Sequence, residues 1–153
     1  MMKYVVLISF ILLSAACSSV QSADIRQVAN KQGQQQTEQL SSISSKKWNH
    51  GAKDCTLEPE AAIDVYQHNA SSYILRQSKC LSFEAPFIYL LIGEEKALLI
   101  DTGATESAVE FPLYQTVQQL IHAHTTGVKN KALLVVHSHS HGDHYRADGQ
   151  FKG

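Results

Sequence analysis

The amino-acid sequence predicts a mixed α/β domain behind an N-terminal export signal. Two observations predict the fold. Short apolar runs with the composition of β-strands occupy residues 63–100. A stretch with helical periodicity, over 109–124, and a further apolar run, over 131–136, follow them. The chain has 153 residues, which is enough for one domain of this kind.

Residues 1–16 are expected to direct export and not to belong to the fold. A short basic start precedes an uncharged, mostly apolar run over residues 4–16, which is short for a bilayer span and typical of a secretory signal. The small residues before Cys17 resemble the lipobox of bacterial lipoproteins, which implies that Cys17 is lipidated and becomes the new N-terminus. The alternatives are ordinary secretion with cleavage at the same small residues and, disfavoured by the length of the run, a transmembrane anchor. We expect a protein of the periplasm or cell envelope, attached to the membrane by lipid.

Residues 17–47 are expected to form a flexible tether between the lipid and the domain. This segment is rich in Gln and Ser and poor in large apolar residues, so it buries too little surface to offset its ordering entropy. A short amphipathic helix within Asp24–Glu38 is compatible with its pattern. The folded domain is then expected over residues 48–153, beginning near Trp48.

Export also changes how the cysteines are interpreted. Once Cys17 is set aside, Cys55 and Cys80 remain as a pair in an oxidising compartment. We expect one disulfide between them, joining the start of the domain to its early strands. The alternative is two buried free thiols that pack as small apolar residues.

Four strands are expected in the first half of the domain. The first two cover residues 63–68 and 72–77, with a short turn between them. The next two, over 87–92 and 97–100, are near-continuous apolar runs joined by a hairpin turn. Runs of this kind are typical of strands covered on both faces.

The period then changes to that of a helix. Apolar residues three and four apart predict an amphipathic helix from Val109 to His124, with Pro112 in its first turn and its end by Gly127. Another buried strand is expected over 131–136. A strand, a helix and a strand in this order predict a right-handed crossover and a locally parallel sheet.

Residues with metal-ligand chemistry follow this last strand directly, in the run HSHGDH over 139–144. Residues two apart in an extended segment point to the same side, so His139 and His141 can present two imidazoles to one ion. Gly142 can adopt positive φ, which would let the chain turn and bring Asp143 and His144 to a second position nearby. These ligands suit Zn²⁺, and Fe or Mn are also compatible.

Two other interpretations of the histidines remain open. His137 and His139 have the same spacing, but that pair would leave Asp143 four residues beyond it instead of two, so His139 and His141 are favoured. Four histidines within eight residues can also be a nonspecific tract that scavenges metal. The interleaved Asp143 and the apolar strand before the run favour an ordered site.

The run resembles the HxHxDH signature of the metallo-β-lactamase superfamily, and its surroundings agree. A strand ending in Asp101-Thr102-Gly103, a helix and a second strand lead into the signature in the order that the family has. The resemblance covers roughly Tyr73 to Gly153. It implies the N-terminal half of a four-layer αββα sandwich, in a chain that is truncated relative to the family.

The resemblance also implies roles for individual residues. His139 and His141 would bind a first zinc ion, and Asp143 and His144 a second. Asp101 would lie beside the site and hydrogen-bond the loop without binding metal. A hydroxide between the metals, with a pKa of about 7, would attack a carbonyl or phosphoryl centre, and Asp143, the catalytic residue, would orient it. The implied substrate is a small molecule with an ester, lactone or amide bond, β-lactams included.

The family has further ligands downstream of the signature, namely a third histidine, a bridging carboxylate and a fourth histidine. This sequence ends at Gly153, nine residues after His144. We therefore expect a fragment of a longer reading frame, or a truncated product, that exposes much of its apolar sheet, folds poorly and is inactive by itself. The alternative function is a surface lipoprotein that binds zinc without catalysis. The net charge of −1 gives no reason to expect nucleic acid as a partner.

Overall fold

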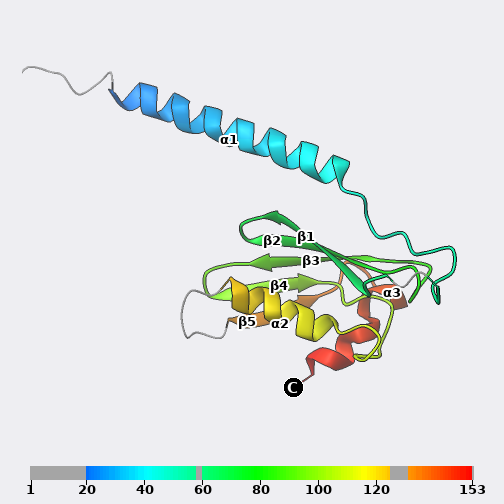
Figure 1. The fold of residues 1–153 in the computed structure, drawn as a ribbon. Helices are drawn as coiled ribbons and strands as arrows, with labels where there is room; N and C mark the ends of the chain where they lie inside the picture. The colour runs from blue at the N-terminus through cyan, green and yellow to red at the C-terminus, as the bar shows by residue number, and fades with distance from the viewer. Residues whose placement is uncertain (1–19, 58–59, 125–130, 153) are drawn as a thin grey trace, which may run out of the picture. The chain divides into compact units, whose positions relative to one another are not determined.

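The computed structural model describes residues 20–57, 60–124 and 131–152, which form a five-stranded sheet and four helices (Figure 1). The chain divides into two compact units, residues 1–41 and 42–153, and the second holds the whole sheet. This is the mixed α/β class that the sequence predicts. The expected signal over 1–16 and the expected lipidation at Cys17 lie outside the described residues.

The first helix, α1 (Val20–Ser45), occupies most of the segment that was expected to be a flexible tether. The short helix allowed within Asp24–Glu38 is the central part of this longer one. The helical segment has no Pro, one Gly and seven Gln residues, and the straight side chain of Gln loses little rotamer freedom in a helix. The local helix propensity of these residues therefore favours α1. No helix in the described part of the chain is long and apolar enough to cross a bilayer.

The sheet has its strands in chain order, β1 to β5. The first four are antiparallel neighbours, and β4 and β5 are parallel. Their bounds are β1 Ile63–Asn69, β2 Ser72–Gln77, β3 Phe87–Ile92, β4 Lys96–Ile100 and β5 Ala132–Val136. The predicted strands and the predicted parallel pair are confirmed, with differences of at most one residue at a strand end.

Helix α2 (Leu113–Ala123) connects β4 to β5 and buries Leu113, Val117 and Ile121. The helix is shorter at its start than predicted. Pro112 precedes it with non-helical dihedral angles, and Val109, which the periodicity included, is 94% exposed in a turn. Phe111 is fully buried in its place, because the loop after β4 returns its aromatic ring to the core. The expected end near Gly127 lies outside the described residues.

The core lies between α2 and one face of the sheet, and fully buried side chains of the central strands fill it, including Leu75, Ile88, Leu90 and Leu99. The opposite face is open over the last strands, where Tyr89, Leu91, Leu134 and Val136 are 41–52% exposed. The prediction that these strands are covered on both faces is therefore wrong for the part of the chain that the structure describes. An apolar composition shows that a strand can be buried on both faces, but in the described part of the chain only one face of the sheet is covered, by α2. The expected exposure of much of the apolar sheet is confirmed.

Cys55 and Cys80 form a disulfide with a Cα–Cα distance of 5.6 Å, as predicted. It joins the segment before β1 to the loop between β2 and β3. The alternative of two free thiols is wrong for this structure. Such bonds are typical of proteins outside the cytoplasm, which agrees with the expected export.

Candidate metal centre

The parallel pairing of β4 and β5 creates the site, because both strands end at the same edge of the sheet. Ile100 lies opposite Val136, so the residues that follow the two strands leave the sheet side by side. The Asp101 amide continues the ladder and donates to the Val136 carbonyl at 2.8 Å. The register thereby places Asp101 next to the start of the histidine-rich loop.

Asp101 is the buried anchor of this loop. Its side chain is 4% exposed, and its carboxylate accepts hydrogen bonds from the Ser138 amide at 2.7 Å, the Ser138 hydroxyl at 2.8 Å and His144 Nδ1 at 2.7 Å. Burial acts to raise the pKa of Asp101, but the hydrogen bonds from His144 and Ser138 outweigh it and hold that pKa below its ordinary value. Asp101 also has a φ of 70°, a conformation costing on the order of 1–3 kcal/mol in a residue other than glycine. The three hydrogen bonds offset this cost.

His144 is oriented by these contacts. It lies in the short helix α3 (Gly142–Tyr145), and its backbone carbonyl accepts from the Thr102 amide at 2.7 Å. When Nδ1 donates to Asp101, the tautomer leaves the lone pair on Nε2, the nitrogen that can bind a metal. His144 Nε2 lies 3.0 Å from an Asp143 carboxylate oxygen, so the two groups point to the same place.

His139 completes a group of three residues with Asp143 and His144. One ligand atom from each lies within 4.8 Å of the others, and the rings of His139 and His144 have centroids 3.8 Å apart. Two ligands about 2.0 Å from a tetrahedral zinc ion lie roughly 3.3 Å from each other, close to the 3.0 Å between His144 Nε2 and Asp143. The three residues fit one zinc ion after a small movement of their side chains.

His141 lies beside this group but is not a member of it. Its ring centroid is 4.7 Å from that of His139, and both residues are exposed. The grouping therefore differs from the expected division into a His139–His141 pair and an Asp143–His144 pair. Residues 138–141 form bends instead of extended strand, so the alternation of side chains does not hold there. The prediction that Gly142 turns the chain with positive φ is also wrong, because Gly142 begins α3 with an ordinary φ.

His137 lies apart from the group, which answers the question of register. Its Nδ1 is 3.1 Å from the His144 carbonyl oxygen, and its Nε2 is 3.2 Å from an Asp148 carboxylate oxygen. Neither Ser138 nor Asp148 was identified from the sequence. The signal for Ser138 would have been the parallel register, since it sits two residues beyond the partner of Ile100. No pattern in the sequence indicates Asp148.

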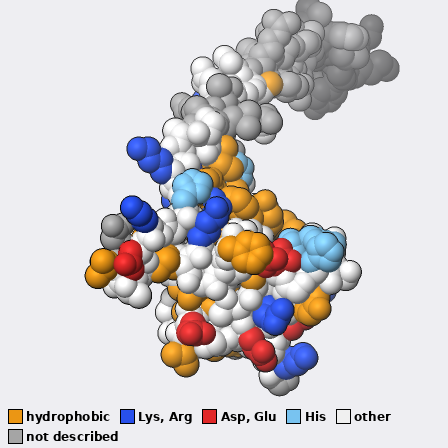
Figure 2. Space-filling view, turned by 90° about the vertical axis from the view of Figure 1, so that its right-hand side faces the viewer, with side chains coloured by type: hydrophobic (Ala, Val, Ile, Leu, Met, Phe, Trp, Pro, Cys, Tyr) orange, Lys and Arg blue, Asp and Glu red, His pale blue; other side chains and the backbone are white. Residues whose placement is uncertain are grey.

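The site is partly exposed to solvent. The side chains of Asp143 and His144 are 19% and 16% exposed, and histidine side chains gather at the surface at one edge of the folded unit (Figure 2). Three protein ligands with an accessible fourth position are the arrangement of catalytic zinc sites, whereas structural zinc sites are closed by four. In comparisons with known proteins, neither a family model nor a curated protein matches this chain.

Proposed function

We propose that this protein is an exported metal-dependent hydrolase related to the metallo-β-lactamase superfamily. One observation carries the proposal, namely the convergence of His139, Asp143 and His144 at the end of β5, with His144 held by the buried carboxylate of Asp101. The substrate is a small molecule with an ester, lactone or amide bond. The sheet with α2 on one face is compatible with half of an αββα sandwich, and lipid attachment at Cys17 is part of the proposal.

Each residue of the site would have a separate role in this reaction. His139, Asp143 and His144 would hold the zinc ion, which would supply the Lewis acidity that activates water as a nucleophile near neutral pH. Asp143 would also orient the attacking water toward the substrate carbonyl. Asp101 fixes the tautomer of His144 and so leaves the lone pair of Nε2 free to bind the ion. His141, adjacent to His139, is available for the same ion or a second one.

The partial exposure of the site favours an enzyme over a purely structural metal site. His139 is exposed, so a substrate can approach it without movement of the sheet. A zinc-binding lipoprotein without catalytic activity is the alternative, and it needs the same ligands. The two functions differ in whether the protein with bound zinc catalyses hydrolysis.

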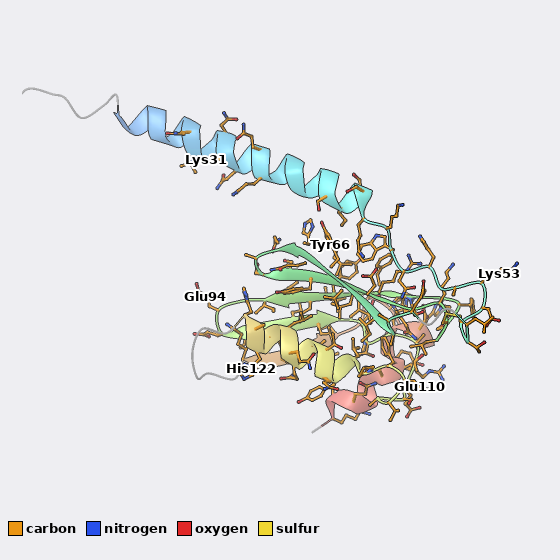
Figure 3. The ribbon with its side chains drawn as sticks, in the orientation of Figure 1. Lys31, Lys53, Tyr66, Glu94, Glu110 and His122 are labelled. Atoms are coloured by element: carbon orange, nitrogen blue, oxygen red, sulfur yellow. A yellow bond between two sulfur atoms is a disulfide. The ribbon has the colours of Figure 1, made fainter. Side chains whose placement is uncertain are left out.

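The first experiment is a zinc titration of the metal-free chain against a chromophoric chelator. We expect saturable zinc binding that His144→Ala and Asp143→Ala each abolish or weaken at least about tenfold, because each variant removes a direct ligand. His122→Ala is the matched control, since His122 lies on the surface of α2 and not in the metal group (Figure 3). Equal zinc binding by all four proteins would contradict an ordered site and indicate nonspecific scavenging.

The second experiment measures zinc-dependent hydrolysis of chromogenic ester, lactone and β-lactam substrates, with the 153-residue chain and with any longer product of the same reading frame. We expect turnover from the longer product that chelators remove and zinc restores. Tight zinc binding with no turnover of any substrate by either protein would favour the non-catalytic lipoprotein.

A further inference from the structure

A second set of polar contacts lies near the metal ligands and involves Thr102, Asp148 and His137. The Thr102 hydroxyl donates to one Asp148 carboxylate oxygen at 2.9 Å, and His137 Nε2 lies 3.2 Å from the other. The opposite nitrogen of the same ring, Nδ1, lies 3.1 Å from the backbone carbonyl oxygen of His144. The chain of contacts therefore runs from the end of β4 through Asp148 and His137 to the backbone of His144.

The contacts on His144 come from two directions. Asp101 holds its imidazole at 2.7 Å, whereas its carbonyl oxygen lies near both the Thr102 amide and the His137 ring. An imidazole turns about its Cα–Cβ bond, so fixing the backbone and one ring nitrogen together determines where Nε2 points. His137 is itself held in place, because the ring of Tyr145 packs edge-on against it with centroids 6.2 Å apart.

The short helix that carries Asp148 is well anchored. This 3₁₀-helix, η1 (Arg146–Phe151), follows α3 without a break and places Ala147 in the core with no exposed surface. The Arg146 amide donates to the Gly103 carbonyl at 3.0 Å. The Asp148 carboxylate thus projects from a segment fixed to the loop after β4, and it can serve as a fixed point for His137.

We propose that His137 and Asp148 are positioning residues of the metal site, which hold the backbone of His144 so that its Nε2 faces His139 and Asp143. The proposal rests on the proposed metal binding by these three ligands. His137 does not bind the ion, since both of its ring nitrogens face other partners. The imidazole of His137 lies between a carboxylate on η1 and a carbonyl on α3, and in either neutral tautomer it donates a hydrogen bond to one of them.

The expected effect is modest, because the pair is partly exposed. The side chains of His137 and Asp148 are 31% and 35% exposed, and water competes for their hydrogen bonds. A hydrogen bond of this kind is worth roughly 0.5–1.5 kcal/mol, which corresponds to about a two- to tenfold change in affinity. Loss of the pair should therefore weaken zinc binding by about three- to tenfold, less than loss of a ligand.

The experiment compares zinc affinity, and the visible absorption spectrum of bound Co²⁺, among variants of the full chain. Asp148→Ala and His137→Leu should each weaken zinc binding by about three- to tenfold and shift the Co²⁺ spectrum, because the position of the His144 ring changes. Asp148→Asn keeps an oxygen for Thr102 and a polar group for His137, so it should bind within about twofold of the unaltered protein. This rescue separates positioning from a general loss of folding.

The control is Glu94→Ala, which removes a carboxylate from the turn between β3 and β4, at the end of the sheet away from α3 (Figure 3). It should leave affinity and spectrum unchanged. The proposal is overturned if the unaltered chain binds zinc and either Asp148→Ala or His137→Leu binds it equally well with the same spectrum. If the unaltered chain binds no zinc, the proposed metal site fails and this proposal fails with it. Zinc binding without hydrolysis would remove the proposed enzymatic function and leave the positioning role intact.

Discussion

The disulfide between Cys55 and Cys80 offers a prediction whose size follows from the fold. The two cysteines are 25 residues apart, and the loop they close contains β1, β2 and the turn between them. In the chain-entropy description, closing a loop of this length restricts the unfolded chain enough to stabilise the fold by about 3.5 kcal/mol. The free energy of unfolding should therefore fall by about this amount when the bond is removed.

Trp48 provides the assay, since it is the one tryptophan of the sequence and packs edge-on against Tyr66 and Phe87 at centroid distances of 5.8 and 5.0 Å. Its fluorescence should report urea unfolding of the sheet. With a urea dependence of about 1–3 kcal/mol per molar, reduction of the bond should lower the unfolding midpoint by roughly 1.2–3.5 M. A Cys17→Ser background removes the remaining thiol of the chain.

The double variant Cys55→Ala/Cys80→Ala should match the reduced protein, which separates loss of the crosslink from side effects of the reductant. Two results would refute the reasoning. One is the release of two reactive thiols when the unreduced protein is unfolded, which would show that the bond does not form. The other is a coincident pair of unfolding curves for oxidised and reduced protein, which would show that the loop is already restricted in the unfolded chain.

Three further predictions concern the site and the sheet. Asp101→Asn should weaken zinc binding about 10- to 100-fold in the chelator titration, because the ligand loses its orienting carboxylate; an unchanged affinity would contradict this. Gly103→Ala should lower the free energy of unfolding by about 2–4 kcal/mol, since Gly103 has a φ of 84° and an added Cβ would lie 2.8 Å from an aromatic carbon. Gly149→Ala, where nothing lies within 4 Å, should change it little. Leu99→Ala in the core should cost about 2–5 kcal/mol, whereas Leu134→Ala on the open face should cost about 1 kcal/mol or less; equal costs in urea unfolding would mean that the open face is covered in solution.

The strands were predictable because their signal is local. Runs such as 87–92 combine apolar and β-branched residues between turn residues, and the structure places a strand over the same residues. The start of α2 was not predictable from periodicity, because Val109 fits the apolar stripe and is nevertheless exposed, whereas the path of the loop buries Phe111, which lies outside that stripe. The sequence of a strand also did not predict whether one or both of its faces are covered, because the covering layers depend on the whole fold.

Helix α1 shows the opposite case, in which composition was given too much weight. A segment rich in Gln and Ser has little to bury, and this argues against tertiary packing but not against a helix. Hydrogen bonds within α1 need no partner from the rest of the chain. The composition was therefore a poor guide to secondary structure here, because α1 extends well beyond the short helix that the pattern allowed.

The metal group itself depends on one non-local quantity, the register between β4 and β5. The ligands are close in sequence, but Asp101 reaches His144 because Ile100 lies opposite Val136 in the parallel ladder. A slip of one residue would turn every side chain of β5 to the other face, and it would move Ser138 away from the Asp101 carboxylate. The sequence motif therefore supplies the candidate ligands, whereas the register of the sheet determines whether Asp101 orients the imidazole of His144. Variants that alter the β4–β5 register should accordingly lose zinc affinity even with all three ligands present.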